Sequence, residues 1–231
     1  MGVYLYCVLP EGAPEPGVAG LDGAPLRAVR AAGVCVWIGD VDATPRVDLS
    51  RIRKHDRVIR SAMDAGLSPV PIRFGQVVSD DHALRAHLAE HDYGPVLERI
   101  EGAVEFGVRI LDPESKPEPS RQPEGAAGTA GHATGSGAAH LHALAARFHA
   151  AEARQARALD AARDLDGRLA ECVRESRIEA TDQPAGAVVA HLVQTDAALA
   201  YGARARELAE GYPPLRIVVT GPWPPYSFVD R

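Results

Sequence analysis

Several residue types are scarce in this 231-residue chain, and the scarcity narrows the class of protein. The three cysteines, Cys7, Cys35 and Cys172, are odd in number and show no C-x-x-C spacing. A disulfide framework or a structural zinc site is therefore not expected, and a reducing compartment fits. The N-terminal segment lacks the basic region and cleavage site of a signal peptide, and no apolar run approaches the roughly 20 residues of a membrane span. We expect a soluble, cytoplasmic protein with no membrane partner.

Basic residues are outnumbered by acids, 25 to 31, which gives a net charge of −6. A protein that binds nucleic acid needs a basic face, so nucleic acid is not an expected partner. Catalytic motifs are also missing: the chain has no G-x-S-x-G, no G-x-G-x-x-G and no H-E-x-x-H, and no pair of catalytic acids stands out. We therefore predict no enzymatic activity and no cofactor.

Two histidines one helical turn apart are the nearest approach to a metal site. His87 and His91 fall on one face of a predicted helix, at a spacing that two metal ligands can use. No acid or third histidine is arranged as a further ligand, so we interpret them as helix-surface or half-buried histidines and predict no metal. A metalloenzyme that used them would instead carry stoichiometric bound metal.

Aromatic residues are few: the chain has 12, against 40 alanines, and four of the 12 lie in the last twenty residues. Three prolines in 221–229 lack N–H donors and should prevent this tail from continuing a sheet ladder. A rigid, extended tail can lay its aromatic rings on a surface at little ordering cost. Either it folds back on this chain's own apolar face, or it docks another protein. The candidate partner-binding residues are Arg73, Phe74, Trp223, Pro224, Pro225, Tyr226 and Phe228.

Apolar periodicity predicts an α+β protein with two α+β domains. The first, residues 1–111, reads β-β-β-α-β-α-α-β and ends in an alternating strand over 103–111. Residues 112–139 are rich in Pro, Gly, Ser and Ala and should form a flexible linker. The second domain, residues 140–231, reads β-β-α-β behind a long helix from about Ala138 to Glu171. Other helices are expected at 48–65, after Ser79, at 95–100 and at 196–210, and other strands at 3–9, 26–30, 34–38, 172–179, 187–193 and 215–220.

The long helix carries an apolar stripe at the 3,4 spacing of a coiled coil. Its members are Leu141, Leu144, Phe148, Ala151, Gln155, Ala158, Ala162, Leu165 and Leu169. Packing within this chain, or in an antiparallel helix pair, is favoured, and pairing between chains is the alternative. A second hypothesis concerns Arg73 and Glu105: each is polar and lies in an extended segment, and we predict a structural pair between them across a sheet.

Taken together, these segments resemble the gas vesicle protein F/L family. The matching pieces of the first half are Gly20-Leu-Asp-Gly-Ala-Pro-Leu, His55-Asp-Arg-Val, Val70-Pro-Ile-Arg-Phe-Gly and Glu105-Phe-Gly-Val. Those of the second half are Ala190-His-Leu-Val and Gly221-Pro-Trp-Pro-Pro-Tyr-Ser-Phe-Val. The low-complexity stretch 112–139 departs from the family, which usually carries more helix and more charge there.

The resemblance implies an accessory protein of gas vesicle formation without enzymatic activity, located at the gas vesicle in the cytoplasm. It implies contact with the small, hydrophobic major shell protein and with other gas vesicle accessory proteins, in nucleation or assembly of the shell. It implies a modified ferredoxin-like fold for the C-terminal domain and leaves self-association open. The alternative function is a regulatory, ferredoxin-like α+β module that binds a small molecule. That module would need a well-formed pocket with convergent polar groups.

Overall fold

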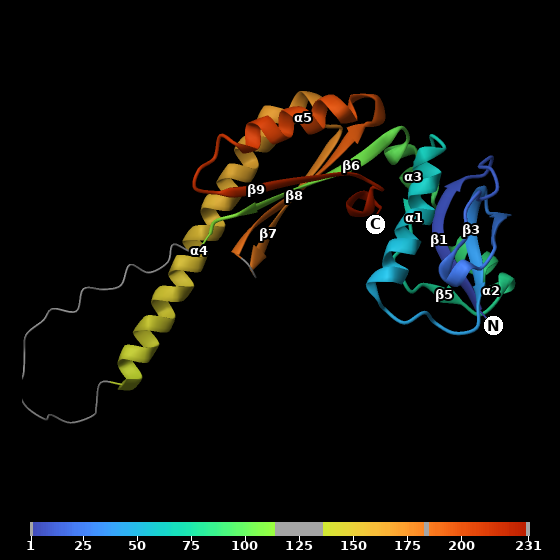
Figure 1. The fold of residues 1–231 in the computed structure, drawn as a ribbon, viewed down its shortest axis with the longest axis horizontal. Helices are drawn as coiled ribbons and strands as arrows, with labels where there is room; N and C mark the ends of the chain where they lie inside the picture. The colour runs from blue at the N-terminus through green and yellow to red at the C-terminus, as the bar shows by residue number, and fades with distance from the viewer. Residues whose placement is uncertain (1, 114–135, 183–184, 230–231) are drawn as a thin grey trace, which may run out of the picture.

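Two antiparallel sheets, each packed with helices, make up the chain (Figure 1). The computed structural model describes residues 2–113, 136–182 and 185–229, with only the backbone described over 136–140. The predicted α+β class is confirmed. The linker predicted over 112–139 falls mostly outside the described residues, and its last four residues are the first of the long helix. Among the helices that the structure describes, none combines the length and the apolar character needed to cross a bilayer.

The first sheet has the strand order β2-β3-β1-β4, with a further short strand, β5, also paired to β1. Its strands are β1 (Gly2–Pro10), β2 (Leu26–Ala31), β3 (Val34–Val41), β4 (Val70–Pro71) and β5 (Val77–Val78). The predicted hairpin is present: Ala31 pairs with Val34 across a two-residue turn in which Ala32 and Gly33 both have positive φ. Every residue of β1 between its two ends is buried, as a strand that is apolar on both faces should be.

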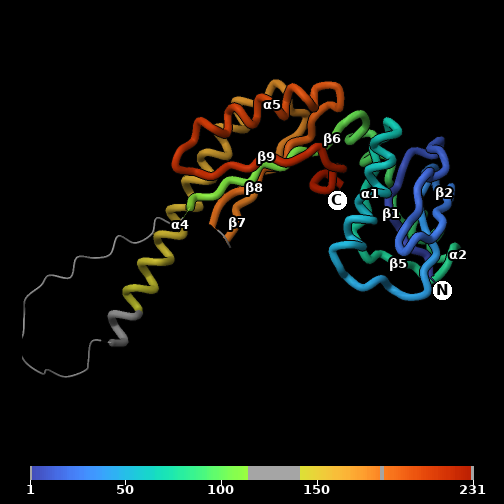
Figure 2. Tube along the Cα trace, in the orientation of Figure 1, coloured from blue at the N-terminus to red at the C-terminus, as the bar shows by residue number. Residues whose placement is uncertain are grey.

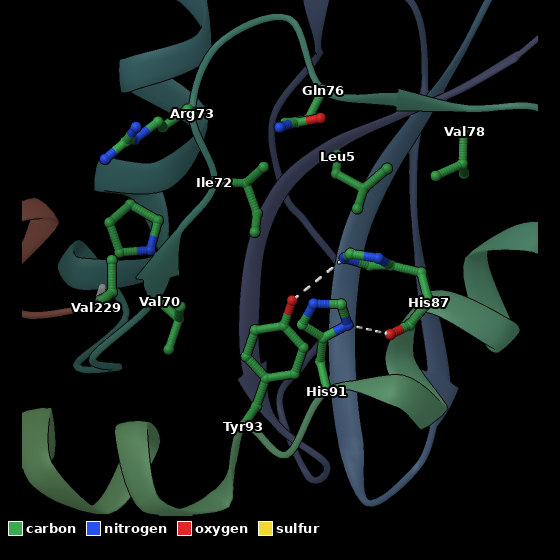
Figure 3. Close-up of a pocket in the computed structure, with 11 residues that line it drawn as sticks. Leu5, Val70, Ile72, Arg73, Gln76, Val78, His87, His91, Tyr93 and Val229 are labelled. Carbon is green, nitrogen blue, oxygen red and sulfur yellow. Dashed lines mark hydrogen bonds between the residues drawn. The ribbon is translucent and has the colours of Figure 1, made fainter. Parts of the chain in front are cut away.

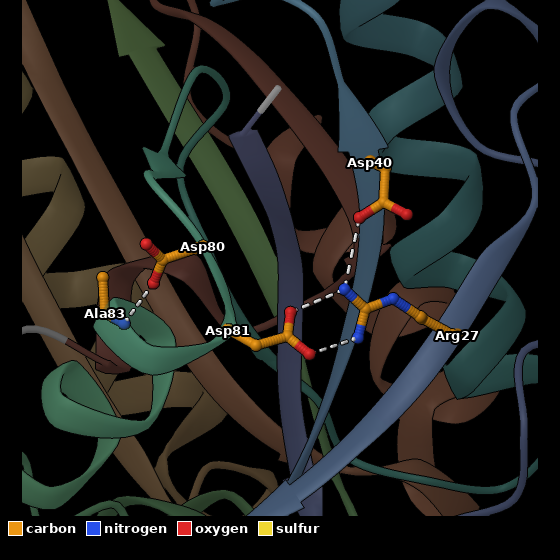
Figure 4. Close-up of polar contacts among 5 residues, drawn as sticks. All are labelled: Arg27, Asp40, Asp80, Asp81 and Ala83. Atoms are coloured by element: carbon orange, nitrogen blue, oxygen red, sulfur yellow. Dashed lines mark hydrogen bonds and ion pairs between the residues drawn. The ribbon is translucent and has the colours of Figure 1, made fainter.

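Three helices belong to the first half: α1 (Leu49–Asp64), α2 (Asp81–Glu90) and α3 (Gly94–Ile100). α1 begins after Asp48, whose carboxylate accepts a hydrogen bond from the backbone N–H of Arg51. The sequence predicted Ser79 as the residue that caps α2, but the cap is Asp80. Its carboxylate accepts the Ala83 N–H at 2.8 Å (Figure 4).

A bidentate ion pair fastens the start of α2 to the first sheet. Arg27 on β2 donates to both carboxylate oxygens of Asp81, at 2.6 and 3.0 Å, and to Asp40 on β3 at 3.2 Å (Figure 4). The hydrogen bond from Arg27 lowers the pKa of Asp81. Because bidentate pairs fix an orientation, this contact helps to orient α2, whose Leu84 and Leu88 pack in the apolar cluster on the face of the sheet.

The second sheet has the strand order β7-β8-β6-β9, and two helices cover one of its faces (Figure 1). Its elements, in chain order, are β6 (Ala103–Leu111), α4 (Ser136–Leu169), β7 (Glu175–Asp182), β8 (Ala185–Gln194), α5 (Ala198–Ala209) and β9 (Arg216–Trp223). Short 3-10 turns lie at Leu21–Gly23, Ala170–Cys172, Thr195–Ala197 and Tyr226–Phe228. The order β-α-β-β-α-β supports the ferredoxin-like assignment of this half, which stays a prediction.

One strand lies apart from the half in which the sequence placed it. β6 was expected to close the first domain, but it pairs with β8 and β9 in the middle of the second sheet. Alternating apolar residues show that a strand has one buried face, and they do not show which strands flank it. The face itself is as predicted, because Val104, Phe106, Val108 and Ile110 belong to the apolar cluster under α4 and α5. A domain boundary at residue 111 stays a prediction.

Candidate functional site

The C-terminal tail, Gly221–Val229, lies between the two sheets, on the face of the second sheet opposite α4 and α5 (Figures 1 and 2). β9 runs into the tail as far as Trp223, which pairs with Glu105 of β6. The prediction that the prolines end the ladder was wrong for Pro222. The register of β9 against β6 shifts between Gly107 and Glu105, and an irregular pairing tolerates a residue without an N–H.

Gly221 allows the tail to turn this closely past β6. Its φ of 124° is a conformation that L side chains rarely adopt, and an added Cβ would lie 2.8 Å from the backbone oxygen of Glu105. A residue with a side chain at position 221 would clash with the backbone of β6, so the tail needs glycine there.

Glu105 anchors the returning tail. Its two carboxylate oxygens accept hydrogen bonds from Ser227, from the backbone N–H at 2.7 Å and from the hydroxyl at 2.8 Å. Burial raises the pKa of Glu105, and these bonds oppose that rise. Ser227 reaches both oxygens because β6 lies beside β9 in the second sheet and the chain folds back over it. The pair predicted between Arg73 and Glu105 stays a prediction.

Three residues of the tail are buried within this chain. Phe228 is fully buried in an apolar cluster that also contains Leu5 of the first sheet and Leu192 of the second. Pro224 and Pro225 are buried as well. For these three tail residues the structure favours the first of the two alternatives, in which the tail closes this chain's own apolar face.

Trp223 is exposed at the surface together with Pro222, with 37% of the tryptophan accessible. The guanidinium of Arg60 on α1 lies 4.2 Å from the centre of its ring. Arg60 is itself held by Asp56, whose carboxylate accepts its Nε–H at 2.6 Å. Tyr226, half-buried, packs against the aromatic cluster of the first half. The tail thus presents one orientated aromatic ring at the junction of the two sheets.

The second predicted segment, Arg73-Phe74, lies where the chain leaves the first sheet between β4 and β5. His55 on α1 donates its Nε2–H to the backbone oxygen of Ile72 at 2.8 Å. Tyr4 donates its hydroxyl to His55 Nδ1 at 2.9 Å and accepts the N–H of Gly75 at 3.2 Å. The Phe74 ring packs edge-on against His55, with the ring centres 5.7 Å apart. Arg73 is therefore exposed on a segment that is fixed on both sides.

The sequence did not assign His55 this role. It was placed on the apolar face of its helix without a partner. The available indication was a histidine at an apolar position, opposite a strand that carries two tyrosines among apolar residues. A buried imidazole needs hydrogen-bond partners, and tyrosine hydroxyls are suited to supply them.

A cavity of about 440 Å³ opens beside Arg73 (Figure 3). It is lined by Leu5, Val70, Pro71, Ile72, Arg73, Gln76, Val78, His87, His91, Tyr93 and Val229. His91 donates its Nδ1–H to the backbone oxygen of His87 at 2.8 Å, and the Tyr93 hydroxyl lies 3.5 Å from His87 Nε2. The two histidines are half-buried, and the bond from His91 occupies the backbone oxygen of His87. In the part of the chain that the structure describes, no three His, Cys, Asp or Glu side chains are grouped to hold a metal ion.

A second buried histidine ties the helices of the second half to their sheet. His191 on β8 donates its Nε2–H to the carboxylate of Asp166 on α4 at 3.0 Å, and Tyr201 on α5 donates its hydroxyl to Nδ1. The arrangement repeats that of Tyr4 and His55, so each half holds one neutral imidazole beneath a tyrosine hydroxyl. Burial lowers the pKa of both histidines.

We expect this pair of histidines to make the protein less stable in mild acid. Because the folded pKa values lie below the ordinary value of 6.5, the unfolded chain binds these protons more readily. The stabilisation is present above pH 6.5 and is lost as the pH falls through the lowered folded pKa values. The slope should reach about 1.4 kcal/mol per pH unit for each histidine. Urea unfolding at pH 7.5 and 5.5 measures it.

Glu105 acts in the opposite sense, since burial raises its pKa above 4.5. Its contribution to stability is present below pH 4.5 and is lost as the pH rises through the raised folded pKa. Glu105 therefore offsets the loss of stability from the histidines only at the acid end of the pH range. His191→Gln should reduce the slope between pH 7.5 and 5.5, whereas His149→Gln, at an exposed position on α4, should leave it unchanged. Equal stability of the wild type at the two pH values would contradict the prediction.

Comparison with known proteins finds relatives that match this chain over most of its length. A family model described as gas vesicle synthesis protein GvpL/GvpF matches residues 2–230. Gas vesicle protein L of Streptomyces sp. (strain CB03234) is 32% identical over 253 residues, which cover 97% of this chain and 91% of that protein. Gas vesicle protein F of the same strain is 27% identical over 253 residues and is covered, like this chain, to 100%.

Solved structures agree in fold. The crystal structure of the gas vesicle protein GvpF from Anabaena sp. PCC7120 matches with a TM-score of 0.73 at 19% identity, covering 100% of this chain and 98% of that one. GvpF from Microcystis aeruginosa gives a TM-score of 0.72 at 17% identity, with 100% and 99% covered. The family is one of gas vesicle proteins and not of enzymes. With the family model spanning residues 2–230, this chain belongs to the gas vesicle synthesis protein family GvpL/GvpF.

Proposed function

We propose that this chain is an accessory protein of gas vesicle formation that binds the small, hydrophobic major shell protein and assists nucleation or assembly of the shell. Membership of the family supports a role in gas vesicle formation. Other gas vesicle accessory proteins are the further partners proposed, and the gas vesicle, in the cytoplasm, is the proposed location. A shell protein that is largely apolar would aggregate if left unbound, so a bound accessory protein can hold it until it joins the shell.

The observation that carries the shell-binding proposal is the exposed, orientated ring of Trp223 at the junction of the sheets. Tryptophan is enriched among the residues that dominate binding energy at interfaces. Arg73 is the second accessible residue of the predicted set, and part of Tyr226 is the third. Pro224, Pro225 and Phe228 are buried, so we propose that they hold Trp223 in place without contacting the partner themselves.

The test is capture of the major shell protein by immobilised wild type and by Trp223→Ala. We expect capture to weaken about tenfold, because truncation of an anchoring tryptophan commonly costs more than 1 kcal/mol of binding free energy. Trp223→Ala/Tyr226→Ala should weaken it further and reduce the number of vesicles in cells. Leu199→Ala, which shortens an exposed apolar side chain on α5, is the matched control.

Unchanged capture and normal vesicles in the double variant would exclude the tail from shell binding. Thermal unfolding of each variant has to be measured alongside. Weakened capture supports the proposal only where the folded population remains the same.

The alternative of a small-molecule-binding module depends on the cavity beside Arg73. The imidazoles that line it are already engaged, with His91 bonded to the backbone of His87 and Tyr93 beside the His87 ring. A ligand site needs polar groups that converge on the ligand, and these converge on one another. The assembly function is therefore the one that we favour.

A further inference from the structure

The first half of α4 projects from the body of the protein (Figures 1 and 2). Every residue from 141 to 150 is exposed, whereas further along the same helix Ala158, Ala162 and Leu165 are fully buried against the second sheet. The helix therefore has a packed part and a part that no other described element covers.

The projecting length keeps the apolar stripe of the packed length. Leu141, Leu144 and Phe148 are 66%, 41% and 63% exposed. At 3,4 spacing they continue the row that contains Ala158, Ala162 and Leu165. A helix that is only surrounded by water gains nothing from large apolar residues along one row, so this row has the pattern of a face that another helix covers.

The second sheet limits how far such a helix can extend. Gln155 donates its side-chain N–H groups to the backbone oxygen of Thr181 and the carboxylate of Asp182, at 3.1 and 3.0 Å, where β7 ends. Arg157 forms an ion pair with Asp112 at 2.6 Å, next to the end of β6. From Ala151 onward every residue of the row is at least partly buried, so the fully exposed stretch runs from 141 to 150.

Charge along the open stretch distinguishes its two edges. On a helical wheel the exposed Arg147 lies beside the apolar row on one side. On the other side Glu152 is hydrogen-bonded to His149 at 3.2 Å. The edge at Arg147 is thus basic.

We propose that this stretch of α4 docks an amphipathic helix of another protein, one that carries its own 3,4 apolar row and acidic residues along the edge that faces Arg147. Opposite charges that flank an apolar seam set both the partner and its orientation. The site is distinct from the proposed shell-binding surface at Trp223 and does not depend on it.

A second copy of this chain fits the stretch less well. In a parallel pair, the partner helix would continue past Gln155 into the space that the second sheet occupies. In an antiparallel pair centred on Phe148, the two Arg147 side chains would approach each other, and like charges there oppose pairing.

The test uses a designed 21-residue helical peptide with Leu at its a and d positions and Glu at its e and g positions, and a twin with Lys in place of Glu. Binding to the full chain is followed by fluorescence anisotropy. We expect the Glu peptide to bind at least tenfold more tightly than the Lys peptide. Leu144→Gln/Phe148→Gln should weaken binding of the Glu peptide at least tenfold. Ala146→Gln/Ala153→Gln, on the exposed far face of the helix, should leave that binding unchanged.

A charge reversal at Arg147 distinguishes charge-dependent recognition from apolar contact alone. Arg147→Glu should weaken binding of the Glu peptide and strengthen binding of the Lys peptide. Equal binding of both peptides, or equal binding by wild type and Leu144→Gln/Phe148→Gln, would overturn the proposal. So would a dimer of the full chain, detected by light scattering, that Leu144→Gln/Phe148→Gln dissociates, because the occupant would then be a second copy.

Discussion

Replacing Phe228 with Ala is expected to lower the free energy of unfolding by about 3–5 kcal/mol, the range for a fully buried phenylalanine. Its ring has no exposed surface and packs in a cluster that contains residues of both sheets, among them Val8 and Leu192. The guanidinium of Arg177 also lies 5.2 Å from its centre. Removal of the ring leaves a cavity at the junction, so both halves lose contacts at once.

Urea unfolding followed by circular dichroism measures the change. Trp223→Ala is the matched control, because that ring is partly exposed and its loss should cost well under half as much. A loss below about 1 kcal/mol for Phe228→Ala would show that the tail is not a structural closure of the junction. In that case the second alternative, a tail free to dock on another protein, would be the better account.

His55→Ala should cost about 3–4 kcal/mol and should also loosen the Arg73 segment. The imidazole accepts from Tyr4 and donates to Ile72, so its loss leaves a cavity and two buried polar groups without their partner. The same bonds fix the backbone on both sides of Arg73. We therefore expect trypsin to cleave after Arg73 at least tenfold faster in the variant, under conditions where it remains folded.

His82→Ala is the control, since His82 is exposed on α2 and its replacement should change neither quantity. If His55→Ala unfolds the chain, His55→Gln keeps one hydrogen-bonding group and allows the cleavage rate to be measured on a folded protein. Wild-type cleavage rates in a destabilised His55 variant would show that the segment is held by other contacts.

The pieces on which the family resemblance depends prove to be anchoring points. His55 holds the Arg73 segment, Glu105 holds Ser227 of the tail, and His191 joins β8 to α4 and α5. Gly221 lets the tail pass within contact distance of β6. Each of these residues has its partner far away along the chain, and residue pattern alone does not specify such partners.

Much of the local structure of this protein follows from the amino-acid sequence alone. Alternation and 3,4 periodicity located β6 and α4, the turn between two strands was visible at Ala32-Gly33, and the tail was distinguished by its prolines and aromatic rings. These features depend on neighbours within a few residues, which is the range over which backbone sterics and one-sided burial act.

Tertiary packing sets which segments meet. It places β6 in the second sheet, brings Ser227 to Glu105, and buries Phe228 while Trp223 stays at the surface. It also divided the apolar row of α4 into a packed length and an open one. Strand pairing and burial depend on contacts between residues tens to more than a hundred positions apart, and the same local pattern is compatible with many such pairings.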